Sequence, residues 1–219
     1  MTLNIITPFA YYVGQGELED FNFTDLRKDK RITWAPGQSK RSEYEKEMTD
    51  LPLDHFHNKY FRILEYHTKL RDVLTYNFNL FLENTYGNIL GKISTSWLTC
   101  LEEGDRIEPH RHSNCFYSGI LYFDEEYGED AARLQIENPI AKLHESVIPR
   151  HYNVTKENAN NKSSDDITFR PFKGAYYFFP STCWHNTGPH VGNPRKSLAF
   201  NFVIDSPIYN LDSTYNPKW

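Results

Sequence analysis

The sequence predicts a mainly β protein: an antiparallel sandwich or barrel buttressed by helices. From residue 89 onward, short runs rich in β-branched and aromatic residues alternate with Gly, Pro, Asn and Asp, and one long helical pattern precedes them. Tyr and Phe occur 15 times each, and both residue types favour strands. At 219 residues the chain is long enough for one well-cored domain. We therefore expect a single domain over 1–219, with a helical flanking part at 1–90, a β core at 91–205 and a tail at 206–219.

The helical pattern covers residues 53–86. Apolar residues recur there at intervals of three and four, Asp54 is a possible N-cap, and Gly87 is the expected stop. His55 and His57 fall inside this pattern. Because residues two apart on a helix point ~200° apart, these two histidines cannot bind one ion together, and we expect surface or packing roles for them.

Six strands follow in the predicted β core. We expect them near residues 92–102, 116–123, 132–137, 166–169, 174–180 and 197–204. The intervening segment 150–166 is polar and has almost no apolar residue to bury, which predicts a loop. We expect His144 and His151, which border this loop, to be solvated.

Charge and composition exclude several classes of protein. A formal charge of −5, without a local run of Lys or Arg, gives no basis for a nucleic-acid partner. The N-terminal residues lack the pattern of a signal peptide, and no apolar stretch approaches the ~20 residues of a membrane span, so we expect a cytoplasmic protein without membrane contact. Three cysteines, Cys100, Cys115 and Cys183, are an odd number at no zinc-ribbon spacing, which predicts reduced packing residues.

The stretch E-P-H-R-H at 108–112 places His110 and His112 two residues apart before an expected strand. Side chains two apart in an extended segment lie on the same face, ~6 to 7 Å apart at their roots, so two imidazoles can meet one ion at ~2.1 Å each. This pair is therefore competent to bind a metal where the helical pair is not. An exposed pair at a strand end remains the alternative.

The stretch F-F-P-S-T-C-W-H at 178–185 adds a third histidine, His185, and Arg195 follows it ten residues later. Two histidines from one segment and one from a distant strand would form a facial set that leaves three adjacent positions for substrate and dioxygen. An arginine beside this set could hold a carboxylate by two parallel hydrogen bonds, which suggests a keto-acid cosubstrate. His190 is the rival of His185, but it follows Gly188-Pro189, so we expect a loop role for it.

Four motifs occur in order: H-x-H, S-G-I-L-Y-F, F-P-S-x-x-x-H and R-K-S-L-A-F-N-F. This order resembles the 2-oxoglutarate and Fe(II)-dependent oxygenases, whose strands carry H-x-H-P, S-G-V-Y-Y, F-P-S-x-x-x-H-x-V-x-P and R-I-S-I-S-F-N. The resemblance covers residues 93–204, whereas the first 90 residues show no motif that we recognise. It implies a double-stranded β-helix, the jelly-roll or cupin-like fold.

The resemblance also implies roles for single residues. His110 and His185 fall on the two histidine ligands of the metal, and Arg195 falls on the residue that binds the distal carboxylate of 2-oxoglutarate. His112 falls where most members of the wider superfamily carry Asp or Glu. Further hydrogen bonds to that carboxylate could come from Tyr122 or Ser118.

The histidine at position 112 leaves two alternatives open. Three neutral imidazoles leave a ferrous site with a charge of +2, one unit more than a site with a carboxylate. Either His110, His112 and His185 form a three-histidine site, which we favour, or a carboxylate such as Asp105 or Asp124 replaces one imidazole.

The expected activity is a hydroxylase that uses Fe(II), 2-oxoglutarate and dioxygen on an unidentified substrate and releases succinate and CO2. Alternatives are a three-histidine dioxygenase of the cupin type that needs no keto acid, and a jelly-roll binding module without catalysis. Residues 1–50 and the 138–166 segment would hold the determinants of the substrate, and they carry no signature.

Overall fold

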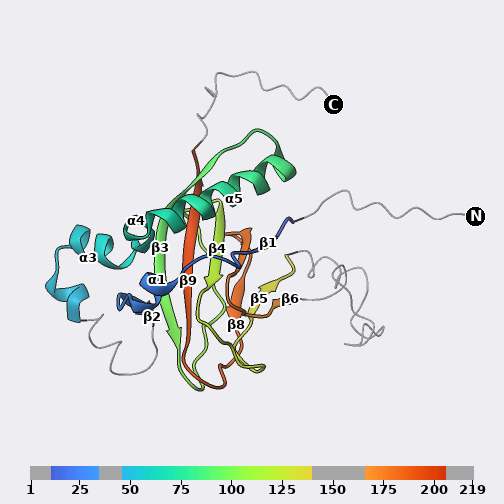
Figure 1. Cartoon of the computed structure of the whole chain (residues 1–219). Helices are drawn as coiled ribbons and strands as arrows, with labels where there is room; N and C mark the ends of the chain where they lie inside the picture. Colours follow the sequence, from blue (N-terminus) through green and yellow to red (C-terminus); the bar gives the residue numbers. More distant parts are fainter. Residues whose placement is uncertain (1–10, 35–45, 140–165, 206–219) are drawn as a thin grey trace, which may run out of the picture.

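The computed structural model describes residues 11–34, 46–139 and 166–205, and it contains two β-sheets with helices on one side (Figure 1). The large sheet has the order β1 (Gly14–Glu17), β7 (Ala175–Pro180), β4 (Tyr117–Tyr122), β9 (Arg195–Ile204), β3 (Gly91–Leu101) and β2 (Ile32–Trp34). The small sheet has the order β6 (Asp166–Phe169), β5 (Leu134–Glu137) and β8 (His185–Thr187). Every strand pair is antiparallel except β2 with β3.

The chain alternates between the two sheets. After β3 in the large sheet, His110 forms a bridge to His185 in the small sheet, and β4 then returns to the large sheet. Strands β5 and β6 lie in the small sheet, β7 in the large, β8 in the small and β9 in the large. This alternation is the double-stranded β-helix, so the predicted fold class is confirmed. The described strands do not close into a barrel, because the two sheets share no ladder of paired strands.

The helices α1 (Thr24–Lys28), α3 (Leu53–Tyr60), α4 (Ile63–Tyr66) and α5 (Thr68–Tyr86) lie on the side of the large sheet away from the small one (Figure 1). Helix α5 buries Leu70, Leu74, Phe78 and Leu82, one residue per turn. Phe78 stacks on Phe202 of β9 with 3.7 Å between the ring centroids. The helix ends at Gly87, whose φ of 84° favours glycine, as the sequence predicts.

The single helix expected over 53–86 is wrong in its continuity, because the structure has three helices there. The chain leaves the helical conformation at Phe61 and Arg62, where the N–H of Ser96 in β3 donates to the carbonyl of Phe61 at 2.9 Å. The Ser96 hydroxyl then accepts from the N–H of Leu64 at 2.8 Å. Strand β3 thus takes hydrogen bonds that a continuous helix would have made. Asp54 is not the N-cap either, since Pro52 holds that position and Asp54 lies in the first turn.

All six predicted strands are present, and their ends differ from the predictions by at most two residues. Three further strands, β1, β2 and β8, were not predicted, because runs of three or four residues carry too little pattern to be recognised without their partners. The predicted polar loop lies outside the described residues apart from Asp166, which begins β6. His144 and His151 also lie outside them.

The two faces of the large sheet have different chemistry. Phe200 and Phe202 of β9 pack into the core beneath the helices. Gly119 of β4 belongs to this face as well, because a Cβ atom there would lie 2.2 Å from the Phe200 ring. The alternate residues of the same strands turn toward the small sheet and include the polar side chains Ser118 and Asn201. The helices therefore stabilise one face and leave the other for a site.

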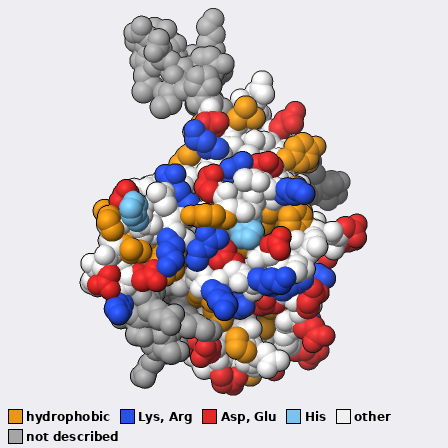
Figure 2. All heavy atoms as spheres, turned by 60° about the vertical axis from the view of Figure 1, so that its left-hand side comes forward, with side chains coloured by type: hydrophobic (Ala, Val, Ile, Leu, Met, Phe, Trp, Pro, Cys, Tyr) orange, Lys and Arg blue, Asp and Glu red, His pale blue; other side chains and the backbone are white. Residues whose placement is uncertain are grey.

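The described residues include no helix long and apolar enough to cross a bilayer. Figure 2 shows Lys and Arg side chains gathered across the middle of one face of the molecule, with Asp and Glu among and around them. Ion pairs of the described residues include Arg27 with Glu125 at 2.6 Å and Arg71 with Glu65 at 2.8 Å.

Candidate metal and cosubstrate site

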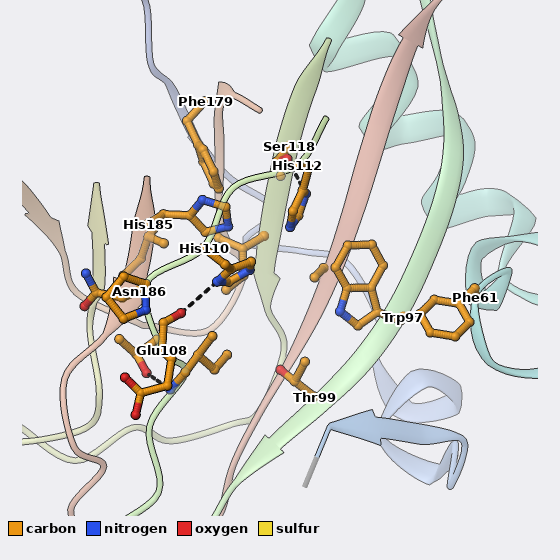
Figure 3. A pocket seen from close by; sticks show the side chains of 17 residues that line it. Phe61, Trp97, Thr99, Glu108, His110, His112, Ser118, Phe179, His185 and Asn186 are labelled. Carbon is orange, nitrogen blue, oxygen red and sulfur yellow. Dashed lines mark hydrogen bonds between the residues drawn. The ribbon is translucent and has the colours of Figure 1, made fainter. Parts of the chain in front are cut away.

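The three histidines predicted from the sequence lie together. The backbones of His110 and His185 exchange two hydrogen bonds, 3.0 and 2.9 Å long, and the N–H of His112 donates to the carbonyl of Ser181 at 2.9 Å. Residues 110–112 thus run extended beside β8, although they do not form a regular strand. One ring nitrogen of each histidine lies within 4.8 Å of the other two, and the rings converge in Figure 3.

Hydrogen bonds at Nδ1 leave the opposite ring nitrogens free. Nδ1 of His110 lies 2.9 Å from the carbonyl of Glu108, and Nδ1 of His185 lies 3.0 Å from the carbonyl of Cys183. A carbonyl oxygen only accepts, so each Nδ1 carries a hydrogen, and Nε2 of a neutral ring keeps its lone pair. Nδ1 of His112 is likewise 2.8 Å from Oδ1 of Asn201 and 2.8 Å from Oγ of Ser118.

Burial favours the neutral form of His112 and His185. It lowers the pKa of His185 to about 3, although the hydrogen bond to Cys183 acts in the opposite direction. It also lowers the pKa of His112, where the hydrogen bond to Asn201 again opposes the effect of burial. A neutral imidazole is the form that binds a metal ion, so these rings suit that role at neutral pH.

The rival ligands lie elsewhere. Asp105 accepts a hydrogen bond from the N–H of Glu102, and Asp124 accepts one from the N–H of Lys196. In the described part of the chain neither carboxylate joins a group of potential metal ligands with the histidines. His190 is buried in a loop, where Nδ1 accepts from the N–H of Ala132 and Nε2 donates to the carbonyl of Asn193.

The helical histidines lie apart from the group too. His55 and His57 are on α3, as predicted, where His55 is exposed and His57 stacks on Phe61. The structure therefore separates the two H-x-H pairs.

Arg195 is buried, with 1% of its surface exposed. Its Nη2 donates to the hydroxyl of Tyr122 at 2.8 Å, and the guanidinium lies over the Tyr122 ring. Nε and Nη1 are buried and find no hydrogen-bond partner among the described residues. Buried N–H groups without a partner are costly, so two of them on one cation match the two oxygens of a carboxylate ligand.

Ser118 differs from its expected role. Its hydroxyl contacts His112 and donates to Asn201 at 2.9 Å, so it lies with the histidines and not with Arg195. A hydroxyl pair lies closer to Arg195 along β9, where Oγ of Ser197 and Oγ1 of Thr99 are 2.7 Å apart.

A cavity of about 430 Å³ opens in front of the histidines. Trp97, Thr99 and Phe61 lie across it from His110 and His185 in Figure 3. The other lining residues include the apolar side chains of Ile107, Pro109, Ile120, Leu134, Phe179 and Ala199. Arg195 and Tyr122 lie further along β9 and β4, beyond the last lining residues of those strands.

The cysteines fit the predicted packing role. None of the three forms a disulfide in the described part of the chain, and Cys100 and Cys183 are buried. Burial raises the pKa of the Cys183 thiol to about 11 and raises that of Cys115 as well. Both thiols are therefore protonated at neutral pH, a form that binds metals poorly.

Comparison with known proteins identifies the class. Residues 95–201 match the family described as "Putative 2OG-Fe(II) oxygenase". These residues, just under half of the chain, are similar to that family, whose members are enzymes that use Fe(II) and 2-oxoglutarate. No curated protein matches the chain.

Solved structures with a related fold include a 2OG-Fe(II) oxygenase family oxidoreductase from Burkholderia pseudomallei, at 12% identity and a TM-score of 0.45 over 63% of this chain and 57% of that one. A prolyl-4-hydroxylase from Pseudomonas putida aligns at 17% identity and a TM-score of 0.38 over 60% of each chain. A viral collagen prolyl hydroxylase from Paramecium Bursaria Chlorella virus-1, solved with 2OG, aligns at 10% identity and a TM-score of 0.40 over 61% of this chain and 72% of that one. The chain spans less than two thirds of the first two of these proteins.

Asn201 is a site residue that the sequence did not predict. The residue lies in the quoted motif R-K-S-L-A-F-N-F, between two phenylalanines. A polar residue that alternates with core residues in a strand faces the opposite side of the sheet, and this signal could have placed it near the site.

Proposed function

We propose that this protein is a hydroxylase that uses Fe(II), 2-oxoglutarate and dioxygen, with His110, His112 and His185 as the metal ligands. The observation that carries the proposal is the buried guanidinium of Arg195, whose Nε and Nη1 lack a partner among the described residues. Arg195 lies in β9 on the face of the large sheet that is turned toward the histidine group. Three neutral imidazoles suit a divalent ion, and a buried cation suits a dianionic cosubstrate. The residues present therefore fit both groups.

Each part of the site has a separate task in this proposal. Nε2 of the three histidines would bind the ion, and Nδ1 of each ring would be held by the oxygen acceptors described above. Arg195 would bind the distal carboxylate of 2-oxoglutarate, and Tyr122 would hold the guanidinium in place. Bound Fe(II), with dioxygen and the conversion of the keto acid to succinate and CO2, supplies the oxidising power for hydroxylation of a C–H bond.

The substrate would approach from the side of Trp97 and Phe61. These two rings face the histidines across the cavity, and their apolar surfaces would help to exclude water from a bound ion. Glu108 and Asn186 are the polar residues on the opposite wall.

The two alternatives account for less of the site. A three-histidine dioxygenase without a keto acid would give Arg195 no ligand for its unpartnered N–H groups. A binding module without catalysis would give no reason for one ring nitrogen of each histidine to lie within 4.8 Å of the other two while each Nδ1 has a hydrogen-bond partner.

The test is turnover of 2-oxoglutarate by the purified chain with Fe(II) in air. We expect slow formation of succinate without a substrate and, under argon, a visible charge-transfer band when Fe(II) and 2-oxoglutarate are both added. Metal binding without succinate or band would favour the dioxygenase that needs no keto acid, and no metal binding would favour the binding module.

A further inference from the structure

A ladder of three polar side chains crosses the inner face of the large sheet beside His112. Ser118 of β4 and Thr95 of β3 are the register partners of Asn201 in β9, one on each side. Oδ1 of Asn201 accepts from Oγ of Ser118 at 2.9 Å, and Nδ2 of Asn201 donates to Oγ1 of Thr95 at 3.0 Å. Nδ1 of His112 lies 2.8 Å from Oδ1 of Asn201.

Asn201 presents its amide oxygen to the imidazole of His112. Nδ2 of Asn201 donates to Thr95, and Oδ1 lies toward His112. That oxygen can only accept, so Nδ1 of His112 carries the hydrogen and Nε2 is left with its lone pair. The Ser118 hydroxyl gives its own hydrogen to Asn201, and its oxygen can accept from the same N–H of His112.

We propose that Asn201 is the positioning residue of the site: it holds His112 as the Nδ1–H tautomer and aims its Nε2 at the metal. This inference rests on the proposed function. It concerns orientation alone, because Asn201 bonds the far side of the ring and does not line the cavity.

His112 differs in this respect from the other two histidines. Backbone carbonyls of Glu108 and Cys183 orient His110 and His185, whereas a side chain orients His112. The ladder also explains how an imidazole serves at position 112. A buried ring N–H needs an acceptor, and Asn201 supplies one for His112. An ionised Asp or Glu at position 112 would have no hydrogen to donate to that oxygen.

Two substitutions separate orientation from packing. Asn201→Leu keeps approximately the size of the side chain and removes the acceptor, whereas Asn201→Asp keeps an oxygen acceptor in nearly the same shape. Asn79→Leu is the matched control. It removes the hydrogen bond of 2.8 Å that Oδ1 of Asn79 accepts from the N–H of Gly91, which lies in the same sheet but away from the histidines. The probes are Ni(II) affinity of the full chain, measured by competition with a chelator, and the tautomer of His112 in the metal-free chain, measured by ¹⁵N–¹H NMR at pH 7.5.

We expect Asn201→Leu to weaken Ni(II) binding by about 10- to 100-fold, the range typical when a partner of a metal ligand is lost. The Nε2–H tautomer of His112 should appear in the same variant. Asn201→Asp and Asn79→Leu should bind Ni(II) within a few-fold of the wild type and keep the Nδ1–H tautomer.

Wild-type affinity and an unchanged tautomer in Asn201→Leu would overturn the inference and leave the proposed function standing. Equal losses in Asn201→Leu and Asn201→Asp would also overturn it, since they would show that packing alone matters. If the wild type bound no Ni(II), the metal site itself would be refuted, and with it the role of Asn201 toward a metal.

Discussion

His110 and His185 hold each other by two backbone hydrogen bonds, so the imidazole of either residue can be removed while the segments stay paired. At the scale of single residues, the assignment of these histidines as metal ligands can therefore be tested by substitution without unfolding the protein. We predict that His110→Ala, His112→Ala and His185→Ala each abolish or severely weaken the binding of one divalent ion per chain. Metal analysis of the purified variants is the measurement.

His55→Ala and His57→Ala are the controls for this prediction, because both residues lie on α3 outside the group. They should retain the ion. Retention in His185→Ala would refute the assignment, and retention in His112→Ala would leave a site that is completed by another residue.

Arg195 gives the second prediction at this scale. Arg195→Met should raise the dissociation constant of 2-oxoglutarate at least about tenfold, since a hydrogen-bonded pair with a charged group contributes about 1.5 to 3 kcal/mol. The control is Lys196→Met, because the Lys196 ammonium points to the carbonyl of Arg27 at 3.5 Å. Titration of the charge-transfer band under argon measures both, and an unchanged constant in Arg195→Met would remove the carboxylate role from this residue.

At the scale of elements, β4 and β9 each serve two purposes through the alternation of their side chains. The side chains on one face of these strands pack beneath α5. The side chains on the other face, toward the small sheet, include Ser118, Tyr122, Arg195 and Asn201. The register between the strands therefore sets the distances within the site. A shift by one residue would exchange the core face with the site face.

Gly119 tests this packing. Gly119→Ala would place a Cβ atom 2.2 Å from the Phe200 ring, and overpacking of this kind costs about 1 to 3 kcal/mol. We expect the free energy of unfolding in urea to fall by that amount. Gly128→Ala should have little effect, because its added Cβ meets no heavy atom within 4 Å, and an equal loss in both variants would contradict the packing argument.

At the scale of the whole molecule, a buried ionic cluster joins the N-terminal segment to the helices. The carboxylate of Asp29 accepts from Nε of Arg31 at 2.9 Å and lies 3.0 Å from Nε2 of His67, at the start of α5. Burial raises the pKa of Asp29, but the hydrogen bonds from Arg31 and His67 outweigh it and hold the pKa well below its ordinary value. The folded state therefore favours the ionised carboxylate.

Because the folded pKa is lowered, the stability from Asp29 is fully present above the unfolded pKa of about 3.9 and is lost as the pH falls toward the folded pKa. We predict that Asp29→Asn lowers the free energy of unfolding at pH 7 by about 1.5 to 3 kcal/mol, the range for hydrogen bonds to charged groups. The difference from the wild type should shrink steadily below about pH 4. Urea titrations at pH 7, 4 and 3 measure it, and a constant difference would contradict the ionic origin.

Local pattern in the sequence was enough for the larger features of this protein. Periodicity predicted the six longer strands and the helical region, because burial on one face imposes a repeat that neighbouring residues display. The order of the motifs predicted the fold and brought His110, His112, His185 and Arg195 forward as one site. That an imidazole can bind a metal ion and a guanidinium can bind a carboxylate is known from the residue types alone.

Tertiary structure decided what depends on residues far apart in the chain. Helix 53–86 breaks because β3 competes for its backbone hydrogen bonds, and β1, β2 and β8 exist through pairing with distant strands. Three features of the site also depend on tertiary structure. Asp105 and Asp124 lie outside the histidine group, two N–H groups of Arg195 have no partner among the described residues, and Asn201 contacts His112. Such contacts join segments that are separated by tens of residues, and the register of the sheets alone brings them within hydrogen-bonding distance.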